Sequence, residues 1–357
     1  MSLNPCACYY IPMYFLKDIG ASENSLQVWF NDILKLMLMR GAMVISDQNK
    51  IIHDNQLIPV QEKFFLFIIN FNAFMMYFRD YMYLLENGHK FILWAVFEGD
   101  QLLCEKYTGP KLRDLDFYVK EMKKIQIRPV SNYCRDVLVS KGFRVESVLP
   151  NMVGSDKFDP NHRPNYDRTP FVFLCVCANT ERKNIPMLLR AFEEEFGEDE
   201  RVVLHIRTSD INGSNLPNHI RVIPKTDSMR ALYKTAHAFV LPSEVEGFGM
   251  PVLESLLNGV PTVVPFHSGM KDFVNESNSL PINYRTKYNT YRSETNIFGN
   301  VYDVDEADLR RQMRNMIRAA PELSKTIDRA SLMNRYANAD VFMRNYEPNK
   351  NASTSQT

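Results

Sequence analysis

Two glutamates and two glycines lie close together in the segment Leu241-Pro-Ser-Glu-Val-Glu-Gly-Phe-Gly-Met-Pro-Val-Leu-Glu254. Gly247 and Gly249 let a ligand approach the backbone closely. A helix beginning near Pro251 would turn its first N–H groups toward an anion. Glu246 in the loop and Glu254 in the first helical turn can then both reach a ligand at the carboxyl end of the preceding strand. An ordinary strand–turn–helix, with Glu254 facing the helix dipole, explains the spacing alone equally well.

The segment sits within an alternation of apolar strands and amphipathic helices. Strands are predicted at 171–177, 202–207, 219–223, 238–241 and 260–264, and helices at 185–196, 228–236 and 251–258. Strands that are apolar throughout and alternate with helices indicate a parallel sheet covered on both faces. Helices at 305–318 and 321–346 follow, before a polar tail at 348–357 that we expect to be disordered.

The N-terminal part shows a similar pattern. Strands are predicted at 7–15, 42–46, 64–70 and 91–97, helices at 23–40, 73–86 and 114–124, and a helix, Gly142 and a strand within 132–150. Residues 151–170 contain several prolines without periodicity and read as a hinge. We therefore expect an α/β protein of two domains, 1–150 and 171–332, with a helix at 333–347 completing the first. Two parallel sheets whose carboxyl edges face each other would enclose a ligand cleft.

The 242–254 segment, followed by Gly259-Val-Pro-Thr-Val-Val, resembles the E-x₇-E signature of retaining glycosyltransferases of family 4. Three other segments resemble that family in the same order along the chain: Val130-Ser131, Val148–Pro160, and Arg182-Lys183-Asn184 before a helix. Gly20-Ala21 resembles its first glycine loop. The resemblance covers residues 10–345, most clearly 130–275. It implies the GT-B fold, with two tandem Rossmann-like, doubly wound domains facing an interdomain cleft.

The resemblance also implies roles, with the donor a UDP- or GDP-sugar. Glu246 and the backbone of Gly247, Phe248 and Gly249 would hold the donor sugar, and Glu254 the ribose. Arg182 and Lys183 would contact the diphosphate. The remaining donor-binding positions are backbone groups at Met250, Val252, Gly20 and Ala21. Fixed cations and helix-start N–H groups stabilise the leaving diphosphate, so neither metal nor cofactor is expected.

Three positions depart from the family pattern. Ala178-Asn179 stands where many members have Gly-Arg, and Glu98 lies where many have a sugar-contacting His. Ser268-Gly269-Met-Lys-Asp272 replaces Gly-Gly-x-x-Glu. Glu98, Asn179 and Asp272 are therefore weaker candidates for donor contacts. These departures leave open an unusual donor or a degenerate site.

Composition excludes several classes of partner. The 357 residues carry 42 basic and 42 acidic side chains, and neither half is strongly basic, which argues against nucleic acid. The six cysteines include two C-x-C pairs without partners for a zinc site, so buried free thiols in a reducing compartment are expected. No signal peptide or spanning segment is evident. We expect a cytoplasmic enzyme with at most peripheral contact with a membrane.

Retaining transfer of a sugar to a hydroxyl of a glycan, glycoprotein or glycolipid is the favoured function. A nucleotide-sugar epimerase on the same fold and a non-catalytic nucleotide-sugar or glycan-binding scaffold remain alternatives. The aromatic residues of 64–83 are expected in the core, and His205 and His237 as packed residues. Residues 284–299 read as an inserted loop, either exposed or lining the acceptor side.

Overall fold

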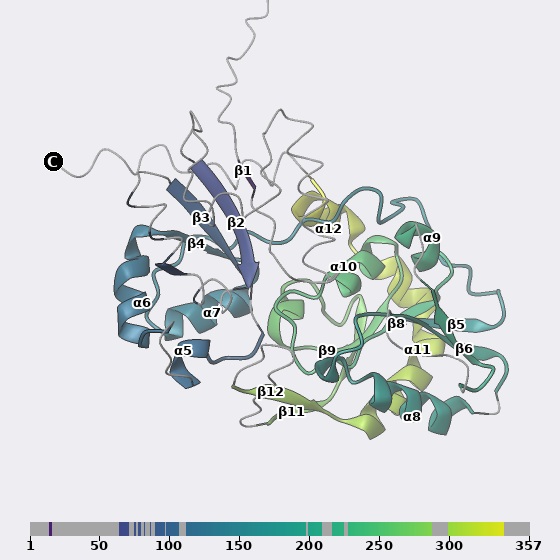
Figure 1. The fold of residues 1–357 in the computed structure, drawn as a ribbon. Coiled ribbons are helices and arrows are strands. Elements are labelled where there is room, and N and C mark those ends of the chain that lie inside the picture. The colour runs from purple at the N-terminus through teal and green to yellow at the C-terminus, as the bar shows by residue number, and fades with distance from the viewer. Residues whose placement is uncertain are drawn as a thin grey trace, which may run out of the picture.

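The computed structural model describes residues 14–15, 64–70, 75, 78, 79, 82, 86, 90–96, 98–106, 112–197, 199–208, 216–224, 228–287 and 299–338. Some expectations lie outside these residues: the helix at 23–40, the strand at 42–46, the tail at 348–357, and Cys6 and Cys8. Figure 1 shows two strand-and-helix units side by side, one built from the first half of the chain and one from the second.

The second half forms a parallel sheet with the strand order of a dinucleotide-binding fold. Its strands are β5 (Phe171–Val176), β6 (Val202–Arg207), β7 (Ile220–Ile223), β8 (Ala238–Val240), β9 (Thr262–Pro265) and β10 (Ser279–Ile282). They lie side by side in the order β10-β9-β8-β5-β6-β7, and all neighbours are parallel. The chain order reverses between β5 and β8, and ligands of such sheets bind at the carboxyl ends beside that reversal.

Helices cover this sheet as the apolar spacing predicts. They are α8 (Ile185–Phe196), α9 (Met229–Tyr233), α10 (Met250–Leu257), α11 (Glu306–Thr326) and α12 (Arg329–Tyr336), with short 3₁₀ turns η2 (Glu181–Lys183) and η4 (Ser268–Asp272). The buried face of α8 carries Ile185, Leu188, Phe192 and Phe196. Ion pairs on its outer side, such as Arg310–Glu194 at 2.6 Å, tie α8 to α11.

The first half contributes a second parallel sheet. Its described strands are β1 (Tyr14–Phe15), β2 (Phe64–Asn70), β3 (Lys90–Val96) and β4 (Gln126–Pro129), in that spatial order. The described helices here are α5 (Leu103–Lys106), α6 (Leu115–Glu121) with the 3₁₀ turn η1 (Met122–Lys124), and α7 (Asn132–Ser140). Ser131 begins α7 because its side chain accepts a hydrogen bond from the Cys134 N–H.

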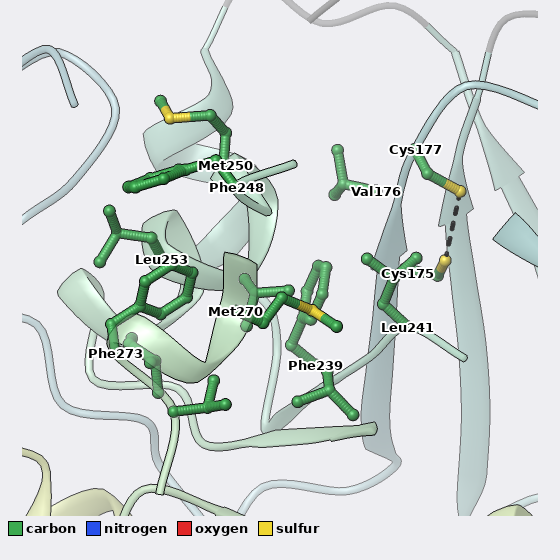
Figure 2. Packing of buried hydrophobic residues seen from close by; sticks show 14 of the residues in the cluster. Cys175, Val176, Cys177, Phe239, Leu241, Phe248, Met250, Leu253, Met270 and Phe273 are labelled. Carbon is green, nitrogen blue, oxygen red and sulfur yellow. Dashed lines mark hydrogen bonds between the residues drawn. The ribbon is translucent and has the colours of Figure 1, made fainter. Parts of the chain in front are cut away.

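The hydrophobic core around α10 anchors the loop that carries the candidate site. Phe248 is buried and packs against Phe273, with ring centroids 5.4 Å apart. Figure 2 shows Phe248, Met250 and Phe273 gathered on the α10 side, with Cys175 on β5 and Cys177 just after that strand on the opposite side. Four free cysteines are buried in the described residues, which agrees with the expected thiols: Cys104, Cys134, Cys175 and Cys177.

Three sequence-based expectations were wrong. The strand after Gly142 does not form, because residues 143–149 make isolated hydrogen bonds to β4, such as Leu149 N–H to Pro129 O, instead of a ladder. The break expected between helices at 305–318 and 321–346 is absent there, because α11 continues through Pro321 to Thr326, and Asp328 caps the next helix, α12. Residues 284–287 form strand β11 (Tyr284–Lys287), paired with β12 (Val301–Val304), and residues 288–298 lie outside the described chain.

The segment 151–170 lies in contact with the second unit. The Asp159 N–H donates to Asn258 Oδ1 at 3.0 Å, and Asn258 Nδ2 donates to Lys157 O at 3.1 Å. His237 is packed as expected: it is buried, and its Nδ1 accepts a hydrogen bond from Val172 N–H. No helix among the described residues has the length and apolar character needed to cross a membrane.

Candidate functional site

The candidate site is formed where the loops after β5 and β8 meet. The β5 loop leads into η2, which carries Arg182 and Lys183, and the β8 loop carries Glu246. Both loops leave the carboxyl ends of the strands beside the reversal in strand order, so the fold places them together. All three side chains are buried.

Four charged side chains form one cluster. Arg182 Nη1 lies 3.0 Å from Glu246 Oε1, and Lys183 Nζ also donates to that oxygen. The other end of the guanidinium, Nη2, lies 2.5 Å from Glu98 Oε1. The structure therefore brings together the predicted residues Arg182, Lys183 and Glu246 and one of the weaker candidates, Glu98, which follows strand β3.

The two carboxylates of the cluster differ in their protonation. Burial raises the pKa of Glu246, but the charges of Arg182 and Lys183 outweigh it and hold that pKa at about 2. Burial also raises the pKa of Glu98, where Arg182 lowers it and the charge of Glu246 raises it; the net result is a raised pKa. Glu246 is therefore a fixed anion, and Glu98 is the carboxylate that protonates first.

The sequence around the β8 loop accounts for its shape. Gly249 caps α10 with a φ of 98°, a conformation that disfavours a side chain. A Cβ on Gly269 would lie 2.2 Å from Gly247 O, so the approach of these two loops requires glycine. The Gly269 N–H donates to Glu246 O at 2.9 Å, and the Glu246 N–H donates to Ser268 Oγ at 3.0 Å. The turn at 268–269 thus fixes the backbone of Glu246.

Asn184, the last residue of the Arg-Lys-Asn segment, has a backbone conformation that few residue types adopt. It has a φ of 53° and ψ of 35°, the left-handed conformation that Gly and Asn adopt most readily. Its Nδ2 donates to Pro242 O at 3.0 Å, which links the β5 loop to the β8 loop. The position therefore turns the chain from η2 into α8 while holding the two loops together.

Glu254 lies farther along α10 than the sequence suggested. The helix begins at Met250, so Glu254 falls in its second turn and not in its first. The carboxylate is buried and accepts a hydrogen bond from the Tyr233 hydroxyl at 2.8 Å. Tyr233 comes from α9, so a second helix fixes the orientation of this carboxylate.

The other residues predicted to bind the sugar nucleotide differ in their surroundings. The Val252 N–H donates to Gly249 O at 3.1 Å within the first turn of α10. This N–H is therefore already hydrogen-bonded within the helix and does not point freely toward a sugar nucleotide, as the resemblance implied. Asn179 is exposed on the β5 loop. Both oxygens of Asp272 accept hydrogen bonds from Asn132, at 2.9 Å each, which gives Asp272 a structural role between the two halves. Gly20 and Ala21 lie outside the described residues.

Hydrogen bonds join the first sheet to this site. Ser131 Oγ donates to Gly247 O at 2.7 Å, from the end of β4 to the β8 loop. Asp100 accepts two hydrogen bonds from Asn300, each at 2.6 Å. The carboxyl edges of the two sheets therefore face each other, with the charged cluster at their junction.

Sequence reasoning missed the residues that support the site. Ser268, with a φ of 47°, and His267 were assigned no role, although the family pattern placed their segment beside the site. His267 is buried and stacks on Tyr302, with ring centroids 4.2 Å apart and an interplanar angle of 13°. Its Nδ1 lies 3.0 Å from Ser268 Oγ. Only the spatial proximity of η4 to the β8 loop reveals these contacts.

His267 makes the stability of the protein depend on pH. Burial lowers its pKa from 6.5 to about 3, so the folded protein holds it neutral while the unfolded chain protonates it. Stability should fall as the pH drops below about 6.5, by about 2 kcal/mol between pH 6.5 and about 4.5. Urea unfolding across this range should show a shallower pH slope for His267→Phe than for wild type. An identical slope would contradict the assignment.

Within the described ranges, no group of three or more His, Cys, Asp or Glu side chains is arranged to hold a metal ion. The positively charged side chains of the described cluster are Arg182 and Lys183. Their positions suit a ligand with a negatively charged group at the carboxyl ends of β5 and β8.

Comparisons with known proteins identify the fold and match part of the chain to a family. Residues 158–280, which contain the β5 and β8 loops, match the family model of glycosyl transferases group 1. A search of curated proteins finds no match. Solved structures with similar folds include sucrose-phosphate synthase from Thermosynechococcus elongatus, with a TM-score of 0.67 and 12% identity over 94% of this chain and 97% of that one.

Two further similar structures were solved with ligands. HepE from Anabaena, in complex with UDP and glucose, has a TM-score of 0.65 and 12% identity, covering 94% of this chain and 98% of that one. TarM from S. aureus, in complex with fondaparinux, alpha-GlcNAc-glycerol and UDP, has a TM-score of 0.56 and 14% identity over 79% of this chain. The match spans 54% of the TarM chain. The protein has the GT-B fold, and its residues 158–280 match the group 1 glycosyltransferase family.

Proposed function

We propose that the protein is a retaining glycosyltransferase that moves a sugar from a UDP- or GDP-sugar to an acceptor hydroxyl. The observation that carries this proposal is the cluster of Arg182, Lys183 and Glu246 at the β5–β8 reversal, within the segment that matches the group 1 family. HepE, a structural neighbour, was solved with UDP-glucose.

In this proposal the cations act on the diphosphate. Negative charge grows on the leaving oxygen as the glycosidic bond breaks, and Arg182 and Lys183 stabilise it in a buried site where such charges interact strongly. Reaction on one face of the sugar, with the leaving phosphate accepting the proton of the acceptor hydroxyl, gives retention. Glu246 orients the sugar hydroxyls, and Glu254 those of the ribose.

The first domain, residues 1–150, is the proposed acceptor side, with a glycan, glycoprotein or glycolipid as acceptor. We propose a cytoplasmic enzyme that transfers hexosyl groups without a metal and has at most peripheral contact with a membrane. The free thiols fit a reducing compartment.

The test is a binding and turnover screen in the presence of a chelator. UDP, GDP, UDP-glucose and GDP-mannose are tested by thermal shift, because a ligand that binds the folded state raises the melting temperature. At least one pair of nucleotide and nucleotide-sugar should bind in EDTA. Loss of all binding in EDTA would indicate a metal site.

The donor that binds is then incubated alone and with mixed glycan acceptors. Release of the nucleoside diphosphate that depends on an acceptor, with the anomeric configuration retained by NMR, is the expected result. An epimerised sugar without acceptor would show an epimerase instead. Tight binding without turnover on any acceptor class would favour a binding scaffold.

A further inference from the structure

Glu98 reaches the cationic site from the opposite sheet. It lies just beyond the end of β3, and its carboxylate is bonded to Arg182 Nη2 at 2.5 Å. The exposed fractions of the two side chains are 21% for Glu98 and 11% for Arg182, so the pair is largely shielded from water. The contact joins the first half of the chain to the residue expected to meet the donor diphosphate.

The two terminal nitrogens of the Arg182 guanidinium contact different carboxylates. Its Nη1 donates to Val245 O at 2.9 Å and lies 3.0 Å from Glu246 Oε1. Its Nη2 faces Glu98. With Lys183, the cluster holds two positive and two negative side chains and is balanced. A diphosphate adds negative charge, so one carboxylate must lose its partner or its charge.

Of the two carboxylates, Glu98 is the one expected to lose its contact with Arg182 and to take up a proton. Glu246 is bonded to both cations, whereas among the residues that the structure describes the ion pair of Glu98 is with Arg182 alone. The raised pKa of Glu98, caused first by burial, agrees with this order. Once Arg182 turns its charge to a phosphate, the nearby charge of Glu246 further favours protonation of Glu98.

We propose that Glu98 competes with the donor diphosphate for the Nη2 side of Arg182, so that donor binding is coupled to proton uptake by Glu98. The inference rests on the proposed function. The proton comes from the solvent and forms one O–H bond on the carboxyl group, and no other bond changes. The neutral carboxyl group of Glu98 can then donate a hydrogen bond to the sugar nucleotide, and it no longer repels the negative charge of the diphosphate.

The groups around Glu98 set the direction of the pH effect. They are Arg182 and Lys183 from η2, Glu246 from the β8 loop, Asp100 from the same turn, and Tyr133 from α7, whose hydroxyl donates to Gly99 O. Because binding takes up a proton, donor affinity should increase as the pH falls.

Calorimetric titration of the intact chain tests the coupling. The ligand is UDP-glucose or GDP-mannose, whichever binds in the screen, because neither diphosphate titrates between about pH 5 and about 8. Titrations in buffers of different ionisation enthalpy give the protons taken up per donor. Wild type should take up protons, and its affinity should increase toward low pH.

Glu98→Gln should abolish the uptake that depends on Glu98, bind the donor about tenfold more tightly at neutral pH, and show a nearly flat pH profile. Glu105→Gln is the matched control, because Glu105 also pairs with a cation, Lys141, at 2.7 Å, but belongs to α5. It should behave as wild type.

Two results would overturn the coupling while leaving the proposed function intact. One is a wild-type protein that binds the donor with no proton uptake and a flat pH profile, a measurement that needs no variant. The other is a folded Glu98→Gln protein with unchanged uptake or weaker binding. Failure of the wild type to bind either nucleotide-sugar would reject the proposed function, and this inference with it.

Discussion

Replacing Glu246 with glutamine should reduce turnover about 100-fold or more while leaving the affinity for the bare nucleoside diphosphate nearly unchanged. The carboxylate is a fixed anion, with a pKa of about 2, held by Arg182 and Lys183. In the proposed mechanism it meets the sugar, which a nucleoside diphosphate lacks. Steady-state kinetics and calorimetry on the same protein preparation measure the two effects.

Glu181→Gln is the matched control for this variant. Glu181 belongs to the same 3₁₀ turn as Arg182 and Lys183, but it is exposed. We expect normal turnover from it. Full activity of Glu246→Gln would mean that the Glu246 carboxylate only pairs with the two cations and has no part in sugar transfer. Thermal unfolding must accompany the assay, because Arg182 and Lys183 lose a buried counter-charge in this variant.

Replacing Lys183 with methionine should weaken the binding of both the nucleoside diphosphate and the nucleotide-sugar by about 30-fold or more. Lys183 is buried, and its ammonium is bonded to Glu246, so the positive charge is fixed in place before the diphosphate arrives. Methionine keeps much of the length of the side chain and removes the charge. Calorimetry with both ligands gives the loss.

The double variant Lys183→Met/Glu246→Gln separates binding from folding. Among the described residues, Lys183→Met leaves Glu246 with Arg182 as its ionic partner, which should lower the free energy of unfolding. Removing the charge of Glu246 as well should restore part of that stability without restoring the affinity for the diphosphate. If the double variant recovers both, Lys183 serves the fold and does not bind the donor.

Local sequence signals predicted five of the six strands of the second sheet and missed the edge strand β10. Strands β5 and β8 are apolar throughout, and the apolar stripe of α8 repeats at helical spacing; the bounds of α8 and β6 were predicted to the residue. Arg182, Lys183 and Glu246 were predicted as one site from the resemblance to family 4, and the structure brings their side chains together. The GT-B fold itself was predicted from the resemblance, which the similar structures support.

Contacts between distant segments were not predictable in the same way. The turn at Ser268 holds the Glu246 backbone through a side-chain oxygen, and Ser131 reaches Gly247 across 116 positions of sequence. Neither contact leaves a periodic pattern. The helix through Pro321 was missed because a proline removes one backbone donor, a cost that the packing of a 21-residue helix outweighs. Glu98 was a weaker candidate because it stands where the family often has a His, and its contact with Arg182 joins the two halves of the chain, which no local pattern predicts.

Comparing how Glu246→Gln and Glu254→Gln bind two ligands tests the central claim most directly. Calorimetry in EDTA would measure the affinity of each variant for the nucleoside diphosphate and for the corresponding nucleotide-sugar. Glu254, held by Tyr233, should contact the ribose, so Glu254→Gln should weaken both ligands by about 1.5–3 kcal/mol. Glu246→Gln should leave the nucleoside diphosphate unaffected. Equal weakening of the nucleoside diphosphate by the two variants would contradict the assignment of sugar and ribose to these carboxylates.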